Sequence, residues 1–184
     1  MGLDDAELLR RSRADGELFA ALFDRYFTAL HGYAARRLGG AGGDDVAAET
    51  FLIAFRQRES FDPDRGTVRA WLYGIATNLI REHRRAEERG YRAHTRAAAE
   101  PVYSADLDRA DSRMTAQAAR DRLVAALAGL APQDRDVVLL VVWGELSHEE
   151  VASALGIPAG TVGSRLHRAR KRLRAALDDH AIER

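Results

Sequence analysis

The sequence predicts an all-α protein made of two small helical domains joined by a flexible linker. Apolar residues recur at steps of three and four along most of the chain, and no convincing β-type alternation is found. This pattern stops between residues 90 and 115, where acids are scattered around Pro101 and no apolar face persists. A length of 184 residues with 46% apolar content suits one large or two small packed domains.

Composition excludes several classes of protein. The chain has no cysteine, so it has neither disulfides nor a thiolate metal site, which fits a reducing cytoplasm. No apolar run approaches the ~18 residues of a membrane span, and the charged start is unlike a secretory signal. The six histidines show no metal-ligand spacing, and phosphate-loop and nucleophile-elbow motifs are missing. We therefore expect a cytoplasmic protein without catalytic residues, metal or cofactor, which is not an enzyme.

The first domain is predicted over residues 15–92 and contains three long helices. The first helix ends at Gly39-Gly40, the second starts near Asp44 or Asp45, and a break at Pro63 and Gly66 precedes the third. The third helix, "VRAWLYGIATNLIREHRRAEER", runs to about Arg89. The apolar face that predicts the first helix consists of Leu18, Phe19, Leu22, Phe23, Tyr26, Phe27 and Leu30.

The linker is predicted over residues 93–115 and the second domain over residues 116–178. This domain begins with the amphipathic stretch "ARDRLVAALAGL", and Pro132 suits the first turn of a helix that continues to Trp143. Ser147 and Glu150 then have the spacing of a capping box, which predicts a helix that Gly156 ends. The residues from Ile157 to Gly160 form a turn in this interpretation, and Thr161 caps the final helix.

The final helix has one apolar and one basic face. Residues 161–177 contain six basic residues and no acid, whereas residues 132–160 contain five acids and one arginine. A short helix that Gly156 ends, a tight turn and this final helix predict a helix-turn-helix. Its second helix, the one with an apolar and a basic face, enters the major groove. The alternative is a solvated basic helix that closes a bundle. The apolar face consists of Val162, Leu166, Ala169, Leu173 and Leu177.

These motifs carry a family resemblance. The stretch "LSHEEVASALGIPAGTVGSRLHRARKRLRAAL" resembles region 4 of sigma factors of the extracytoplasmic-function type. "LFDRYFTALHGYAARRLG" and "DDVAAETFLIAFRQRESFDPDRGTVRAWLYGIATNLIREHRR" resemble region 2 of the same family. The resemblance covers about 140 residues and leaves no room for a region 3 domain, as is typical of this subgroup.

The resemblance implies a bacterial transcription initiation subunit. Its partners would be promoter DNA and core RNA polymerase, with region 2 on the clamp helices of the largest subunit and region 4 on the flap of the second-largest subunit. Region 4 would recognise the −35 element, and region 2 would recognise and help open the −10 element. An anti-sigma factor is a further partner that the resemblance allows, although nothing in the sequence shows that one exists.

The resemblance also implies site residues in both domains. Asn78 can read a base edge with one donor and one acceptor group, and Trp71 can stack on a base or pack in the core. Arg168 is expected to make a base contact, because arginine to guanine is the commonest specific pair. Asp45 and Glu49 share one helical face that either meets the polymerase or is simply solvated. The expected residues are Thr161, Ser164, Arg165, His167, Arg168, Lys171 and Arg172 for the −35 element, Trp71, Asn78, Arg81, Arg84 and Arg85 for the −10 element, and Asp45, Glu49 and Phe51 for core polymerase.

The chain departs from the family pattern at two positions. Ala48 stands where glutamine is usual, and Gly163 stands where a basic or polar residue is common. Two other functions compete with the sigma factor, and the two departures bear only on the second of them. One is a stand-alone helix-turn-helix regulator that dimerises through residues 15–92, and the other is a sigma-like relic that titrates an anti-sigma protein.

Overall fold

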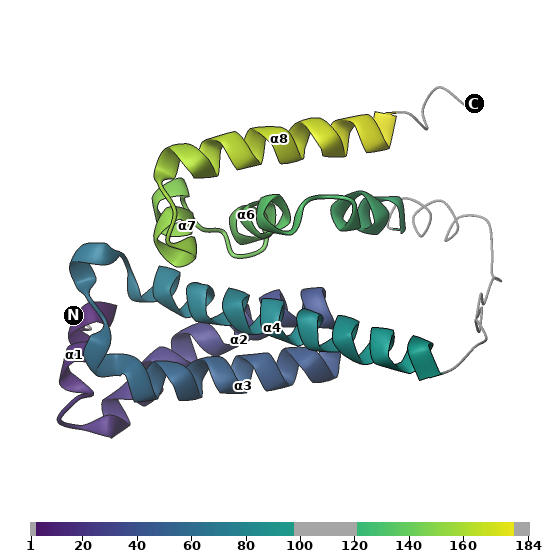
Figure 1. The fold of residues 1–184 in the computed structure, drawn as a ribbon. Coiled ribbons are helices and arrows are strands. Elements are labelled where there is room, and N and C mark those ends of the chain that lie inside the picture. Colours follow the sequence, from purple (N-terminus) through teal and green to yellow (C-terminus); the bar gives the residue numbers. More distant parts are fainter. Residues whose placement is uncertain (1–2, 98–120, 179–184) are drawn as a thin grey trace, which may run out of the picture.

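The computed structural model describes residues 3–97 and 121–178, and within those residues every regular element is a helix. Two halves lie one above the other, with α4 facing the upper half (Figure 1). The lower half contains α1 (Asp5–Arg11), α2 (Ala20–Leu38), α3 (Gly40–Gln57) and α4 (Val68–Ala97), with short 3-10 turns at Gly16–Phe19, Arg58–Ser60 and Pro63–Arg65. The upper half contains a helix over residues 121–128, α6 (Pro132–Val142), α7 (His148–Leu155) and α8 (Ala159–Asp178).

Helices α2 and α3 form a tight antiparallel hairpin around Gly39. Gly39 has φ +82°, a conformation that favours glycine, and α2 ends at Leu38 as predicted. The predicted start of α3 at Asp44 or Asp45 is wrong, because the helix begins at Gly40. A Cβ atom on Gly43 would lie 2.6 Å from the Cα of Ala35, so glycine lets the two backbones approach closely and the helix starts earlier.

Helices of the first half extend beyond residues 15–92, the range predicted for the first domain. Helix α1 precedes residue 15 and contributes the buried side chains of Leu8 and Leu9 to the core. Its start carries a local signal, because Asp4 accepts a hydrogen bond from the Glu7 amide at 2.7 Å. Helix α4 continues to Ala97, past the predicted limit at residue 92. The rest of the predicted linker, residues 98–115, lies outside the described residues.

The turn between α7 and α8 is predicted correctly at its start and wrongly at its end. Gly156 ends α7 in the left-handed conformation, with φ 62° and ψ 38°. Helix α8 then begins at Ala159, so Ala159, Gly160 and Thr161 belong to its first turn, and Thr161 is not its cap. The reason is that the Pro158 carbonyl already accepts a hydrogen bond from the Thr161 amide at 2.9 Å.

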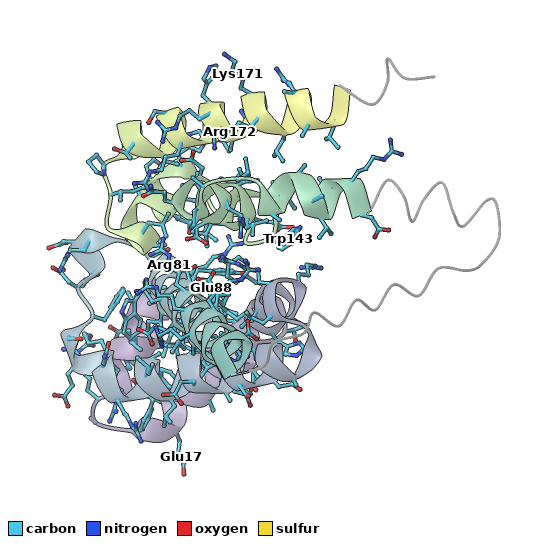
Figure 2. All side chains as sticks on the ribbon, turned by 45° about the vertical axis from the view of Figure 1, so that its right-hand side comes forward. Glu17, Arg81, Glu88, Trp143, Lys171 and Arg172 are labelled. Carbon is cyan, nitrogen blue, oxygen red and sulfur yellow. The ribbon has the colours of Figure 1, made fainter. Side chains whose placement is uncertain are left out.

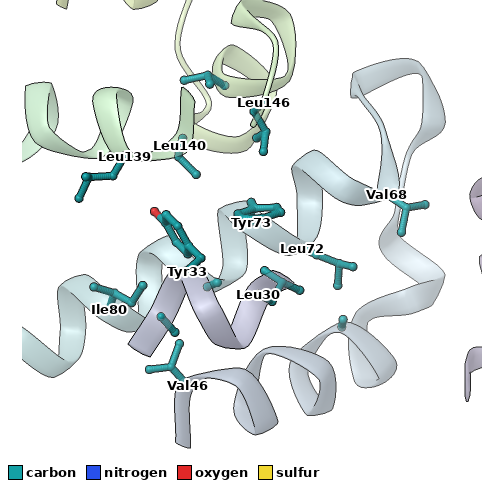
Figure 3. Close-up of a cluster of buried hydrophobic side chains, with 14 of the residues drawn as sticks. Leu30, Tyr33, Val46, Val68, Leu72, Tyr73, Ile80, Leu139, Leu140 and Leu146 are labelled. Atoms are coloured by element: carbon teal, nitrogen blue, oxygen red, sulfur yellow. The ribbon is translucent and has the colours of Figure 1, made fainter. Parts of the chain in front are cut away.

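The two halves share one hydrophobic core. Tyr33 and Tyr73 of the lower half face Leu140 and Leu146 of the upper half (Figure 3). The two tyrosine rings meet edge to face at 5.2 Å, and all four side chains are buried. Packing of α7 on α4, together with side-chain contacts from α6 such as that of Asp136 with Arg81, therefore fixes how the two halves sit in this structure. Within the described ranges, no helix combines the length and apolar character that a bilayer span requires.

Candidate nucleic-acid interface

Helix α7 is anchored at both ends. The Ser147 hydroxyl accepts a hydrogen bond from the Glu150 amide at 3.1 Å, and the Glu150 carboxylate accepts one from the Ser147 amide at 3.0 Å. This is the predicted capping box, and it satisfies two amides that a helix start otherwise leaves unpaired. With Gly156 at the other end, α7 holds the turn that orients α8.

Helix α8 separates its apolar and basic residues as predicted. Val162, Leu166 and Ala169 are buried against α6 and α7, whereas Leu177 is exposed. Lys171 projects from the outer face of the helix (Figure 2). The expected −35 residues on this face are Ser164, His167, Lys171 and Arg172, which are exposed, and Thr161 and Arg165, which are half-buried.

Arg168 has a partner within its own half. Its Nη2 donates to Oδ1 of Asp134 at 3.0 Å, and the Asp134 side chain is only 6% exposed. The hydrogen bond to this carboxylate raises the pKa of Arg168. The guanidinium therefore links α8 to α6, and a base contact by Arg168 requires it to share or leave this partner.

Trp71 and Asn78 lie along a groove between the two halves. Trp71 is half-buried, and its ring packs on Phe61 with centroids 5.3 Å apart. Asn78 is exposed and accepts a hydrogen bond from Arg81 at 3.3 Å. The groove, of about 960 Å³, is lined by both residues, by the loop from Phe61 to Thr67, and by Glu149, Ala152–Ala154 and Gly156–Ala159.

Arg81 and Arg84 are turned inward, unlike the cations of α8. Nε of Arg81 donates to Oδ2 of Asp136 at 2.7 Å, and Figure 2 shows Arg81 in the layer between the halves. Nη2 of Arg84 donates to the carbonyl of Arg37 at 2.8 Å, and burial lowers the pKa of Arg84. Each guanidinium therefore has a hydrogen-bond partner within the fold in this arrangement.

Arg85 lies with the residues expected to meet the polymerase rather than with Trp71 and Asn78. It lines a groove of about 850 Å³ between α3 and α4 together with Asp45 and Glu49, and all three side chains are exposed. Phe51 does not belong to this surface. It is 4% exposed and packs in the core, 4.9 Å from the ring of Phe23 and 6.4 Å from that of Phe19, so its expected polymerase contact is corrected to a core role.

Two buried charges were missed by the sequence analysis. Asp136 has a side chain 1% exposed, and it accepts hydrogen bonds from both Arg81 and Arg37. The side chain of Arg37 is itself 3% exposed and donates to the Tyr33 hydroxyl at 2.7 Å. The available signal was an acid one position before the apolar run "VVLLVV", where a solvated helix face is not expected.

The two departures from the family pattern are both at the surface. Ala48 is exposed and lines the groove between α3 and α4. Gly163 lies inside α8, and a Cβ atom there would meet nothing within 4 Å. Neither position is needed for packing in the described structure. We therefore expect the two departures to change the binding of partners to these faces and not the stability of the fold.

The arrangement suits the binding of nucleic acid. A basic helix face can neutralise phosphates, and an aromatic ring beside an exposed amide can hold an unstacked base. Across residues 3–97 and 121–178, no group of three acids or histidines is placed to hold a metal ion.

Family models match both halves of the chain. Residues 22–90 match Sigma-70 region 2, and residues 120–173 match Sigma-70, region 4. The chain is 34% identical over 175 residues to the ECF RNA polymerase sigma factor SigL of Mycobacterium tuberculosis, covering 93% of this chain and 95% of SigL. It is 33% identical over 178 residues to SigK of Mycobacterium ulcerans, another ECF RNA polymerase sigma factor, covering 95% of each chain.

A solved structure has the same fold over nearly the whole chain. CnrH, determined in complex with the cytosolic domain of CnrY, superposes with a TM-score of 0.68 at 27% identity. The superposition covers 95% of this chain and 97% of CnrH. The order and packing of the two helical halves therefore have a solved counterpart.

Proposed function

The chain belongs to the extracytoplasmic-function sigma factors of the sigma-70 family, and on that premise we propose that it binds core RNA polymerase and directs promoter-specific initiation. Region 4 is assigned to the −35 element and region 2 to the −10 element. The protein acts in the cytoplasm, where the polymerase is, and the chemistry of RNA synthesis belongs to the polymerase. Region 2 is proposed over residues 15–92 and region 4 over residues 116–178, with helix α1 and the end of α4 lying beyond the first of these ranges.

The observation that carries this proposal is the division of faces on α8. Val162, Leu166 and Ala169 are buried, so the helix is fixed on its domain and its basic face points to solvent. A helix held in this way can enter a major groove, with Ser164 and His167 near its start facing base edges. Lys171 and Arg172 lie further along and suit the phosphates that position the helix.

Region 2 contributes the −10 contacts in this proposal. Trp71 and Asn78 are two turns apart on one face of α4, so a base that leaves the stack can meet both a ring and an amide. Asp45 and Glu49 form an exposed acidic face on α3 that suits basic residues of the polymerase clamp.

Regulation by an anti-sigma factor is part of the proposal. The related CnrH was solved with the cytosolic domain of CnrY bound, which supports a protein partner for this chain as well. A stand-alone regulator explains the helix-turn-helix but not the region 2 half. A decayed relic explains Ala48 and Gly163, but it does not require the exposed basic face of α8.

Transcription with purified components tests the proposed function. The chain is mixed with bacterial core RNA polymerase and fragmented genomic DNA, and the transcripts are sequenced. We expect discrete start sites that share elements near −35 and −10. An active polymerase that yields no specific transcripts with the folded chain contradicts the proposal, and a binding assay with core polymerase then separates a relic from a stand-alone regulator.

Two variants test which half of the chain recognises which promoter element. We expect Asn78→Ala to lower transcription roughly tenfold and to relax preference at one −10 position, because a good base contact is worth ~1–3 kcal/mol. Glu88→Ala, on an exposed part of the same helix, is the matched control. His167→Ala should relax the −35 preference instead, with the exposed Gln133→Ala of the same half as its control.

A further inference from the structure

We propose that Arg58 and Arg13 are positioning residues for −10 recognition, because they connect the end of α1 to the loop before α4. This loop, residues 58–67, carries the aromatic ring on which Trp71 packs. The inference rests on the proposed function, in which Trp71 meets a base of the −10 element. It gives a role to α1, which precedes residues 22–90, the part of the chain that matches Sigma-70 region 2.

Helix α1 lies at the same end of the first half as this loop and is firmly held there (Figure 1). Leu9 is fully buried, and the Asp5 carboxylate accepts hydrogen bonds from Arg25 and Tyr26 of α2. Ser12 follows the helix, is also fully buried, and donates its hydroxyl to the Leu9 carbonyl at 2.7 Å. The end of α1 is therefore a fixed point to which the loop can be attached.

Arg58 connects this fixed end to the start of the loop. Its Nε donates to the Ser12 carbonyl at 3.2 Å, and its Nη1 donates to the Phe55 carbonyl at 2.5 Å. The guanidinium carbon also lies 4.0 Å from the centroid of the Phe55 ring. Because arginine presents several donors in one rigid plane, a single side chain can bond both carbonyls in a defined geometry. The ends of α1 and α3 are joined where the loop begins.

Arg13 reaches further into the loop. Its Nη2 donates to the Phe61 carbonyl at 3.4 Å, which is long for a hydrogen bond of this kind and makes Arg13 the weaker of the two connections. The other two arginines at the end of α1 are engaged within the helix, since Arg10 and Arg11 both donate to Glu7. In the described part of the chain, Arg13 is the one side chain that donates to the Phe61 carbonyl.

Phe61 carries the connection on to Trp71. The two rings lie 5.3 Å apart at an angle of 49°, and both side chains are half-buried. Phe61 is followed directly by Asp62, whose carboxylate accepts from the Asp64 amide at 3.0 Å and starts the next 3-10 turn. The backbone of Phe61 is therefore held on both sides, and its position decides whether its ring supports the indole of Trp71.

Packing between α1 and the loop is incomplete, which makes the two arginines important. A groove of about 490 Å³ lies between them, with Glu7 and Arg10 on one side and Glu59 and Pro63 on the other. Side chains do not fill this space, so direct packing is interrupted there. The hydrogen bonds of Arg58 and Arg13 carry the connection at this place.

The far end of the loop has different partners. The Ser153 hydroxyl donates to the Arg65 carbonyl at 2.7 Å, and the Thr67 hydroxyl donates to Glu150 at 3.1 Å. These contacts come after Pro63, whereas the contacts of α1 act on the part of the loop that contains Phe61. The two sets of contacts can therefore be tested separately.

A ring held in place before its ligand arrives loses less conformational freedom on binding. Trp71 supported by Phe61 is prepared for an unstacked base in this way, and Arg58 and Arg13 act through that support without touching DNA. Loss of either arginine should therefore weaken the −10 preference. The −35 preference should not change, because α8 lies in the other domain and shares no contact with these side chains.

The fluorescence of Trp71 tests the connection without any DNA or polymerase. The chain has two tryptophans, so Trp143→Phe leaves Trp71 as the single emitter in the otherwise complete chain. In this parent, the emission maximum and acrylamide quenching report how well the indole is covered. Arg56→Ala is the matched control, because Arg56 is exposed on the last turn of α3. Circular dichroism confirms that each variant is folded.

We expect Arg58→Ala to shift the emission to longer wavelength and to increase quenching, and Arg13→Ala to do the same to a smaller extent. Arg58→Lys should recover part of the change, since an ammonium can bond one of the two carbonyls. Arg56→Ala and Ser153→Ala should match the parent. Folded Arg58→Ala and Arg13→Ala variants with unchanged emission overturn the connection, and so does a shift caused by Ser153→Ala alone.

Start-site sequencing with core polymerase tests the role in recognition. We expect Arg58→Ala to lower transcription about fivefold, the effect of losing a weak base–aromatic stack, with a relaxed −10 preference and an unchanged −35 preference. Equal relaxation at both elements would show a general loss of structure and overturn the positioning role. Missing start sites with the wild type refute the proposed function, whereas a shifted Trp71 emission without a change in −10 preference refutes this inference alone.

Discussion

The basic faces of α8 and α4 contain the same kind of residue in opposite states. On α8 the cations Lys171 and Arg172 point to solvent and are available to a phosphate. On α4 the guanidiniums of Arg81 and Arg84 are bonded to Asp136 and to the Arg37 carbonyl. A count of basic residues treats the two helices alike, whereas partners within the fold decide which one is ready to bind DNA.

The strongest way to break this comparison is to charge the buried face of α8. Leu166→Asp buries a carboxylate at a position 3% exposed, so we expect a loss of ~3–5 kcal/mol in the free energy of unfolding. Arg170→Ala, on the exposed side of the same helix, should stay within ~0.5 kcal/mol. Urea denaturation measures both, and equal effects would mean that α8 is not held by this face.

The turn before α8 offers a second test with two glycines four positions apart. Gly156→Ala forces a Cβ into a left-handed conformation, so we expect a loss of ~1–2 kcal/mol. Gly160→Ala lies in the first turn of α8 with nothing within 4 Å, so it should be neutral or gain up to ~1 kcal/mol. If both substitutions have the same sign in thermal unfolding, the helix starts elsewhere.

A third test sets the two groups of cations directly against each other. Lys171→Ala with Arg172→Ala should weaken binding to a −35 duplex, and each loss should reduce the slope of log K against log salt by ~1. Arg84→Ala should leave that slope unchanged and instead cost ~0.5–1.5 kcal/mol of stability, because its hydrogen bond to Arg37 is lost. A slope that responds to Arg84 would show that α4 also contacts this duplex.

The smallest effect concerns the capping box of α7. Ser147→Ala leaves the Glu150 amide without its side-chain partner, and we expect a loss of ~1 kcal/mol. His148→Ala, the next exposed residue, is the control. Thermal unfolding of both variants checks this. Equal unfolding temperatures would mean that the capping box does not stabilise α7.

Local signals made part of this structure predictable from the sequence. The capping box and the Gly156 stop involve residues within a few positions of one another, and both were found where predicted. The start of α3 was missed because it depends on Gly43 packing against Ala35, which is a contact between two helices. Propensity alone does not contain that information.

The candidate site was likewise predictable only where its signals are local in the sequence. The outward face of α8 was predictable because its period of three and four fixes which residues are buried. The inward state of Arg81 was not, because its partner Asp136 lies 55 positions away and meets it only when the halves pack together. Phe51 was misassigned for the same reason, since its neighbours Phe19 and Phe23 come from two other elements.

One distance tests the account most directly. Because the chain has no cysteine, Glu17→Cys and Ala175→Cys attach two spin labels at exposed sites in the two halves, away from every proposed contact. Pulsed electron paramagnetic resonance then gives the distance between them in the free chain and in the complex with core polymerase and promoter DNA. We predict one short, narrow distance when the chain is free and a distance tens of ångströms longer in the complex. The same distance in both states would contradict the account in which the two packed halves of this structure move apart so that each reaches its promoter element.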